Sequence, residues 1–246
     1  MRKLAVINYK GGTGKTSTVV NMAHGLALLG KRVLIVDTDP QGSAGYYLGV
    51  ESDVTVYDVV MGLRPVSECI VSARPNLDII CANERLFPAE MRLATEKGRE
   101  HVLSRRLASL TGYDFIIVDC APSMNLMNQN SLIFSDELLL PVSMEYLSLV
   151  GIKQLLKNID IVNKILGKEI RICKIVPTFY DKRNRKTAHI MDSLERVFPG
   201  QLSSPIRVSV GLSESPGYRQ TIFEFSPRSS AADDYRRLIN EVLSHG

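Results

Sequence analysis

A glycine-rich stretch near the N-terminus constrains the fold of this chain more than any other feature. The residues from Tyr9 to Ser17 read Tyr-Lys-Gly-Gly-Thr-Gly-Lys-Thr-Ser; they follow the apolar run Leu4–Ile7 and precede a helical pattern. Glycines at such a turn let backbone N–H groups converge on an anion, and the new helix directs its positive end at the same point. The stretch therefore predicts a phosphate-binding loop between a strand and a helix.

The residue types in this loop predict contacts to a nucleotide and to magnesium. Lys15 is expected to reach the β- and γ-phosphates, and the Thr16 hydroxyl to ligate Mg²⁺. The general pattern G-x-x-x-x-G-K-[ST] requires glycine at the position of Tyr9, and it gives no role to the second lysine, Lys10. A glycine-rich turn with two solvated lysines is the alternative, and the order strand, loop, helix favours phosphate binding. The loop residues expected to bind the nucleotide phosphates are Gly11, Gly12, Thr13, Gly14, Lys15, Thr16 and Ser17, and the pattern leaves Lys10 without a role of its own.

The composition indicates a globular protein with a buried core. The chain has 246 residues, of which 45% are hydrophobic and 23% are charged, as is typical of soluble domains. No apolar run approaches the roughly 18 residues of a membrane span, and Met1 leads directly into a strand, so we expect a cytoplasmic protein. The net charge of +4 permits polyanion binding without arguing for it. The four cysteines and four histidines are too scattered to predict a disulfide or a structural metal site.

Apolar periodicity predicts alternating helices and strands. A helical pattern from Val19 to Leu29 ends at Gly30, and the β-branched run Arg32–Val36 follows, which makes a βαβ unit and hence a parallel sheet. We predict a single P-loop NTPase domain over residues 1–246, an α/β fold with a mostly parallel twisted sheet and helices on both faces. Glu51–Pro75 is expected to be irregular. Further strands are expected at Leu77–Cys81, Phe115–Val118, Leu138–Val142 and Ile170–Val176, and helices at Arg99–Leu110, Leu149–Leu166, Thr187–Val197 and Ala231–Leu243.

Carboxylates follow two of the predicted strands. Asp37 and Asp39 belong to the string Asp-Thr-Asp-Pro-Gln after the second strand, and Asp119 ends the run Phe115–Val118. In an open parallel sheet the carboxyl ends of the strands face the ligand, and a carboxylate there can hold Mg²⁺ through water. A helix-capping Asx turn would equally suit the first string, and strands ending in Asp are common. The placement of both beside the loop directs these carboxylates into the region of the phosphate loop, and it favours a magnesium site of Thr16 and Asp119.

The loop variant Lys-Gly-Gly-x-Gly-Lys-[Ser/Thr] resembles the deviant phosphate loop of the ParA/MinD family of ATPases. The resemblance implies that Lys10 reaches across a dimer interface to the nucleotide of the partner subunit. The string from Asp37 to Gln41 looks like switch I of that family, which implies that Asp39 positions or activates the attacking water and that Asp37 helps to hold the Mg²⁺ shell. Catalysis is thereby assigned to Lys10, Lys15 and Asp39. The segment from Asp119 to Ser123 resembles switch II, with Ala121 in place of the usual proline.

The resemblance runs nearly end to end and is nearest to Soj-type chromosomal ParA proteins. Thr178–Arg183 resembles a segment that lies near the nucleotide base, and Leu212–Pro216 and Ser226–Ser229 resemble two further family elements. The resemblance implies base contacts from Thr178, Pro205 and Arg207. It also places Gly211 where the family commonly has a DNA-binding arginine.

Basic residues gather in the C-terminal third, where a solvated face is the alternative to a binding surface. We expect these residues to bind duplex DNA non-specifically through its phosphates, in preference to the alternative of a solvated face. The family resemblance implies an ATP-dependent switch that hydrolyses ATP slowly, dimerises on ATP, is stimulated by a ParB-like partner and positions chromosome or plasmid DNA on the nucleoid. The candidate DNA contacts are Arg183, Arg185, Lys186, Arg207 and Arg219.

Three other functional classes share this loop. A membrane-bound ATPase resembling MinD needs a basic amphipathic tail, and the sequence stops at Gly246 directly after Leu243, so we expect no membrane partner. A positioning ATPase that moves a protein cargo would use the same switch. An ATP-dependent metabolic ligase or an enzyme of the nitrogenase iron-protein type is the third class; the latter needs paired cysteines, and only Cys120 lies near the switches.

Overall fold

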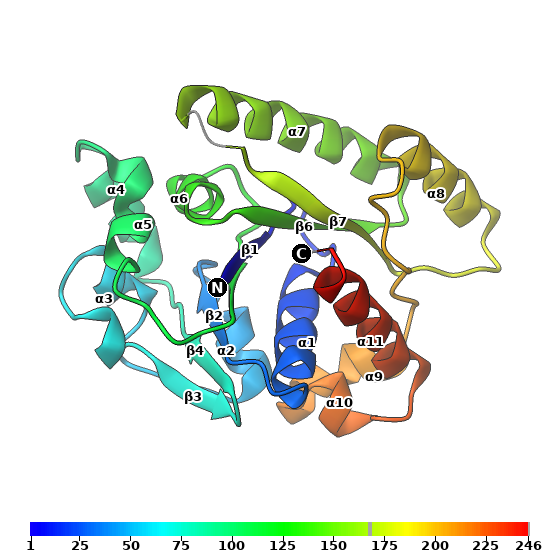
Figure 1. Cartoon of the computed structure of the whole chain (residues 1–246), viewed down its shortest axis with the longest axis horizontal. Helices are drawn as coiled ribbons and strands as arrows, with labels where there is room; N and C mark the ends of the chain where they lie inside the picture. The colour runs from blue at the N-terminus through cyan, green and yellow to red at the C-terminus, as the bar shows by residue number, and fades with distance from the viewer. Residues whose placement is uncertain (167–168, 246) are drawn as a thin grey trace.

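The described residues form one seven-stranded sheet in the strand order β3-β4-β2-β5-β1-β6-β7. The computed structural model describes residues 1–166 and 169–245 (Figure 1). All neighbouring strands pair in parallel except β3 and β4, which are antiparallel. The strands are β1 (Arg2–Val6), β2 (Val33–Asp37), β3 (Val71–Arg74), β4 (Leu77–Ile80), β5 (Phe115–Asp119), β6 (Glu137–Ser143) and β7 (Arg171–Thr178).

Helices cover both faces of this sheet, which is why β2 and β5 are apolar up to their final aspartates. Every residue of β2 and β5 is buried, as expected of parallel strands that lack a solvent-facing side. The helices are α1 (Lys15–Leu28), α2 (Ser43–Leu48), α3 (Val56–Val60), α4 (Leu86–Leu93), α5 (Val102–Arg106), α6 (Leu126–Phe134), α7 (Tyr146–Leu166), α8 (Arg185–Val197), α9 (Val210–Glu214), α10 (Ile222–Phe225) and α11 (Ser230–Leu243), with 3₁₀ turns η1 (Val66–Glu68), η2 (Arg99–His101) and η3 (Ser215–Tyr218).

The two faces bury separate apolar cores. Alternate residues of β1 enter different cores: Leu4 and Val6 pack with α1 and α11, whereas Ala5 packs with residues of α3 to α8. Figure 1 shows α1, α10 and α11 on one side of the sheet and α6, α7 and α8 on the other. The predicted α/β fold with a mostly parallel sheet and helices on both faces is therefore confirmed. Within the described part of the chain, no helix is both long and apolar enough to cross a membrane.

Two expectations about secondary structure were wrong. The region Glu51–Pro75 is not irregular throughout, because it contains α3, η1 and the edge strand β3. A capping box begins α3: the Thr55 backbone N–H donates to the Asp58 carboxylate at 2.9 Å, and such short-range polar contacts start a helix without apolar periodicity. The helix expected over Arg99–Leu110 is confined to α5 after a 3₁₀ turn. The short helices α2, α4 and α6 were not predicted.

Gly25, in the middle of α1, is needed where α1 packs against α10 and α11. A Cβ at this position would lie 2.2 Å from Cδ1 of Ile239 and 2.8 Å from a ring carbon of Phe223. Gly25→Ala is expected to lower the free energy of unfolding by about 1–3 kcal/mol, because overpacking outweighs the gain in helix propensity. Chemical denaturation measures the loss. The control is Gly217→Ala, since a Cβ at Gly217 meets no atom within 4 Å; a Gly25→Ala variant as stable as the wild type would contradict the packing argument.

Candidate functional site

The loop between β1 and α1 has the conformation that its glycines allow. Gly12 and Gly14 have φ angles of 70° and 84°, and Gly14 is the N-cap of α1. These left-handed conformations are strained for residues with a Cβ. The Lys15 ammonium bends back over the loop and donates to the backbone carbonyl of Lys10 at 3.2 Å. The N-terminus of α1 and a buried lysine therefore converge on one point, as the sequence predicts for a phosphate site.

Side chains from neighbouring strands anchor this loop. The Asn8 side chain accepts a hydrogen bond from the Lys10 backbone N–H at 3.0 Å and donates to the Pro141 carbonyl in β6 at 2.8 Å. The Thr178 hydroxyl, at the end of β7, donates to the Thr13 carbonyl at 2.8 Å. The ends of β6 and β7 thus fix the loop. Sequence reasoning did not identify Asn8, although an asparagine between a buried strand and a glycine loop was a usable signal.

Asp37 and Asp119 occupy equivalent positions at the ends of adjacent strands β2 and β5. Asp37 is fully buried, and its two oxygens accept backbone N–H groups of Asp39 and Ala44 at 3.0 and 3.1 Å. Burial raises the pKa of Asp37 well above its usual range, and the negative charge of Asp119 adds to the rise. Thr38 ties the two strand ends together, because its N–H and hydroxyl donate to the Asp119 carbonyl at 2.9 and 2.7 Å.

Asp119 is a buried carboxylate at the end of β5. It is 1% exposed, and neither side-chain oxygen has a partner of acceptable geometry within the described residues. Burial raises the pKa of Asp119 to about 7; the nearby Thr16 side chain and the Lys15 charge oppose the rise, and Asp39 adds to it. Burial likewise lowers the pKa of Lys15, against the attraction of Asp119.

The oxygen groups at this point fit Mg²⁺. Asp119 has two unused acceptor oxygens beside the Thr16 hydroxyl, and hard divalent cations prefer such ligands. Asp37 fits a supporting role better than direct ligation, since its oxygens already accept two backbone N–H groups. Among the described residues, no three His, Cys, Asp or Glu side chains form a metal-binding group by themselves, so a magnesium ion here would take further ligands from a nucleotide and from water.

Asp39 lies at the mouth of this site. Its carboxylate accepts the Gln41 backbone N–H at 3.0 Å, and its charge acts on both Asp119 and Lys15. The side chain is half-buried, in contrast to the fully buried Asp37. The structure thus brings Asp39 to the same point as Lys15, Thr16 and Asp119, within reach of a ligand from solvent.

Lys10 forms an ion pair within the same chain. Its ammonium bonds the carboxylate of Glu145, which follows β6, and this hydrogen bond and charge lower the pKa of Glu145. Both side chains are accessible, at 31% for Lys10 and 57% for Glu145. The pair stands at a cavity of about 580 Å³ that Gly11, Gly12 and Lys186 also line. Nothing local in the sequence identifies Glu145, because it is 135 residues from its partner.

A second cavity, of about 440 Å³, is lined by Gly14 and Ser17. Of the predicted base contacts, Thr178 and Arg207 line it, whereas Pro205 lines neither cavity, and its role stays a prediction. The Arg207 guanidinium is engaged by buried Asp234, with N···O distances of 2.6 and 2.9 Å. Phe179, which sequence reasoning did not single out, lines both cavities; it is half-exposed and has a φ of 53°.

The candidate DNA contacts do not all lie together. Arg183, Arg185 and Lys186 are at the start of α8, and Arg207 is near them because its strand segment pairs with Tyr180. Arg219 instead packs against Gly49 and pairs with Glu51 at 3.3 Å. Arg183 pairs with Asp181 at 2.8 Å, which lowers the pKa of Asp181 to about 2.

Comparisons with known proteins agree with this geometry. The AAA domain family matches residues 1–172. The sporulation initiation inhibitor protein Soj of Bacillus subtilis is 38% identical over 249 residues, which cover 99% of this chain and 98% of that protein. This chain belongs to the ParA/Soj-type family. The chromosome partitioning protein ParA of Caulobacter vibrioides is 32% identical, with coverage of 99% and 94%.

A solved structure of the same fold contains the expected ligands. Cobyrinic acid a,c-diamide synthase from Mycobacterium smegmatis, with a bound ATP analogue and magnesium, matches with a TM-score of 0.85 and 31% identity, over 100% of this chain and 95% of that one. The resemblance to the ParA/Soj-type family that the loop predicted is therefore confirmed, and proteins of this fold use ATP and Mg²⁺.

The hydrogen bond from Thr178 to the loop is expected to contribute to nucleotide affinity. Thr178→Val should weaken ADP binding about three- to tenfold, because it removes a hydrogen bond worth about 0.5–1.5 kcal/mol and leaves the Thr13 carbonyl without its donor. Titration calorimetry measures the change. Thr178→Ser keeps the hydroxyl and is the matched control; equal ADP affinity for the valine and serine variants would show that this anchor does not matter.

Proposed function

We propose that residues 1–246 work as one ATPase domain that dimerises on ATP and uses the dimer to bind DNA and position a cargo. The observation that carries this proposal is the position of Lys10. It is a second, accessible lysine at the mouth of a completely built phosphate loop. The loop already has Lys15 for its own nucleotide, so the accessible Lys10 ammonium can be transferred from Glu145 to a nucleotide held by a second copy.

The residues of this chain divide the chemistry of hydrolysis among them. Backbone N–H groups of the loop and the Lys15 ammonium bind the phosphates and neutralise their charge. Asp39 holds the attacking water in line with the γ-phosphate, and Lys10 from the partner copy stabilises the charge that develops there. Thr16 and Asp119 would hold Mg²⁺, with Asp37 supporting the shell; the ion supplies charge neutralisation between the phosphates. Loss of the γ-phosphate then releases the segments after β2 and β5.

In its ATP-bound, dimeric state this switch binds DNA. Relatives named for chromosome partitioning match over nearly their whole length, which supports a partitioning role on the nucleoid with a ParB-like activator and slow intrinsic hydrolysis. DNA binding would be non-specific and through phosphates, since the candidate arginines and lysines lie on surface segments around α8 and η3. One chain presents only part of this basic surface, and the dimer doubles it.

Co-sedimentation with duplex DNA tests the proposal. Binding is expected with ATP, to fall with ADP or no nucleotide, and to weaken steeply along a salt series because counterions are released. Lys10→Ala should abolish the ATP-dependent fraction, and Lys97→Ala, at an exposed lysine that lines neither cavity of the site, is the matched control. Binding indifferent to nucleotide, or unchanged in Lys10→Ala, would refute the mechanism.

Glu145 is expected to restrain Lys10 before dimerisation. Glu145→Gln removes the carboxylate that holds the Lys10 ammonium within its own chain, so ATP-dependent dimerisation should tighten about two- to fivefold, a modest gain because exposed ion pairs are weak. Analytical ultracentrifugation with ATP measures it, and ADP samples should stay unchanged. Glu96→Gln, at an exposed position elsewhere, is the control. Unchanged or weaker dimerisation in Glu145→Gln would exclude the restraint.

A metabolic ligase is the second candidate. It is favoured by the 31% identity with cobyrinic acid a,c-diamide synthase over the whole chain. A ligase should hydrolyse ATP in proportion to an acid substrate and without DNA, whereas the partitioning mechanism predicts turnover that responds to DNA and an activator protein. ATP turnover with cobyrinic acid and an amide donor, measured beside turnover with DNA, separates the two.

A further inference from the structure

A polar trough lies at the end of the sheet opposite to the phosphate loop. Its volume is about 540 Å³, and its walls come from the end of α3, from η1 and from the segment that joins α5 to β5. Tyr113 stands two residues before the first residue of β5, whereas Asp119 of the magnesium site is the last residue of that strand. The length of β5 therefore separates the trough from the nucleotide.

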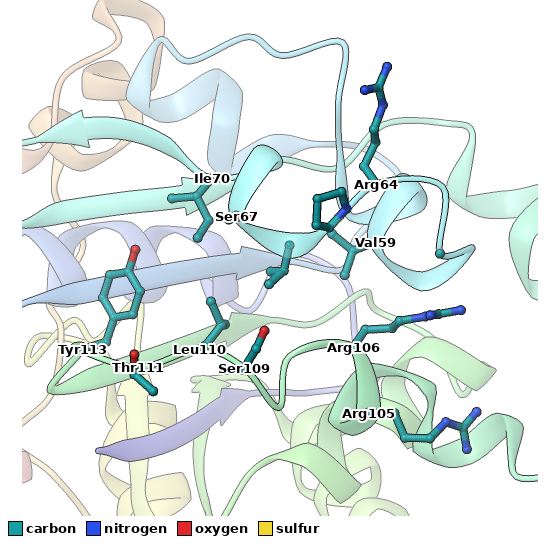
Figure 2. A pocket seen from close by; sticks show the side chains of 13 residues that line it. Val59, Arg64, Ser67, Ile70, Arg105, Arg106, Ser109, Leu110, Thr111 and Tyr113 are labelled. Carbon is teal, nitrogen blue, oxygen red and sulfur yellow. The ribbon is translucent and has the colours of Figure 1, made fainter.

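The trough is cationic at one end. Its lining, all within the described residues, includes Arg64, Arg105 and Arg106 and contains no aspartate or glutamate. Figure 2 shows Arg105 and Arg106 side by side from α5, with Arg64 on the facing wall. Among the described residues, the Arg64 side chain forms one ion pair, an exposed one with Glu68 at 3.2 Å, and such pairs are weak.

Arg106 has unused hydrogen-bonding capacity. Within the described chain its guanidinium makes no hydrogen bond or ion pair, whereas Arg105 donates to the Gly98 carbonyl at 2.8 Å. The Arg106 guanidinium lies against the backbone of Gly62, where an added Cβ would be 2.3 Å from Nη2. Gly62 has a φ of 67°, so a glycine there both makes the turn and leaves room for the arginine.

The rest of the trough offers apolar contact and hydroxyl groups. Buried Val59, Val66 and Leu110 form part of its lining. Tyr113 stands at the end away from the arginines (Figure 2), and its hydroxyl donates to Asp78 at 2.8 Å, which fixes the ring. The hydroxyls of Ser67, Ser109 and Thr111 line the trough and form no hydrogen bond within the described residues.

We propose that this trough binds a small organic phosphate with a planar ring. The phosphate group is recognised by Arg105 and Arg106, because guanidinium groups match phosphate oxygens in geometry and charge. The ring packs on the apolar lining toward Tyr113. The hydroxyls of Ser67, Ser109 and Thr111 form hydrogen bonds with polar atoms at the edge of the ring. The volume is within the range of small-molecule sites. The site is independent of the ATPase mechanism, so either can fail without the other.

Ligand-observed NMR and titration calorimetry with GMP test the site, with the phosphate loop saturated by MgADP. GMP is expected to bind the wild type more tightly than inorganic phosphate, which lacks the ring, or guanosine, which lacks the phosphate. Arg106→Gln should weaken GMP binding about tenfold, as for the loss of one charge-assisted contact. Ser109→Trp, at an exposed position, should block the trough. Arg228→Gln, at an exposed arginine elsewhere, is the control.

The outcomes are distinct. Loss of GMP binding in both trough variants, with the control unchanged, supports the site. Absence of GMP binding to the wild type at millimolar concentration, or equal affinity in Arg106→Gln, overturns it. Binding of inorganic phosphate as tight as that of GMP overturns the planar ring. GMP affinity must not fall as the MgADP concentration is raised further; a fall would show that GMP competes for the phosphate loop and would also overturn the proposal.

Discussion

Two buried carboxylates beside one buried ammonium are the constraint on which this site depends. The parallel register of β2 and β5 places Asp37 and Asp119 at neighbouring strand ends, and Lys15 is the buried cation near them. Removing two like charges from water is costly unless opposite charge compensates them. The raised pKa of both acids expresses that cost. In the proposed mechanism, a divalent cation bound with the nucleotide would supply the additional positive charge that these two acids favour.

The same electrostatics explains why the loop is held so firmly. A phosphate gains from converging N–H groups only if they are already oriented when it arrives. Asn8 and Thr178 fix the loop to the ends of β6 and β7, so their hydrogen bonds are formed during folding rather than during binding. Lys10 is different, because its ammonium is held by an exposed carboxylate and can be transferred to another acceptor at low cost. In the proposed mechanism, the fixed groups bind the nucleotide of the same chain, and the transferable Lys10 ammonium binds the nucleotide of the second copy.

Much of the fold could be predicted because its signals are local. Buried parallel strands have β-branched runs, as in β2 and β5, and the turn before α1 needs glycine at fixed places. The site residues around Lys15, Asp37 and Asp119 follow from those strand ends. Glu145 could not be predicted, because its contact with Lys10 depends on the pairing of β1 with β6. The edge strand β3 was missed for a similar reason: its residues are partly exposed, and its hairpin turns at Asn76 with a φ of 62°.

The number of basic residues in the C-terminal third overstates the positive charge that this part of the chain presents to a polyanion. Buried Asp234 bonds both Arg207 and Arg237, and Asp233 bonds Arg236. Arg183 and Arg219 also have carboxylate partners. A phosphate must compete with these acids, so each contact in a single chain is weak. In the proposed mechanism, binding to DNA then requires many contacts made together, and linking two chains raises the avidity without any new kind of contact. Dimerisation through a shared nucleotide is thus a physical route to DNA binding for a chain whose net charge is only +4.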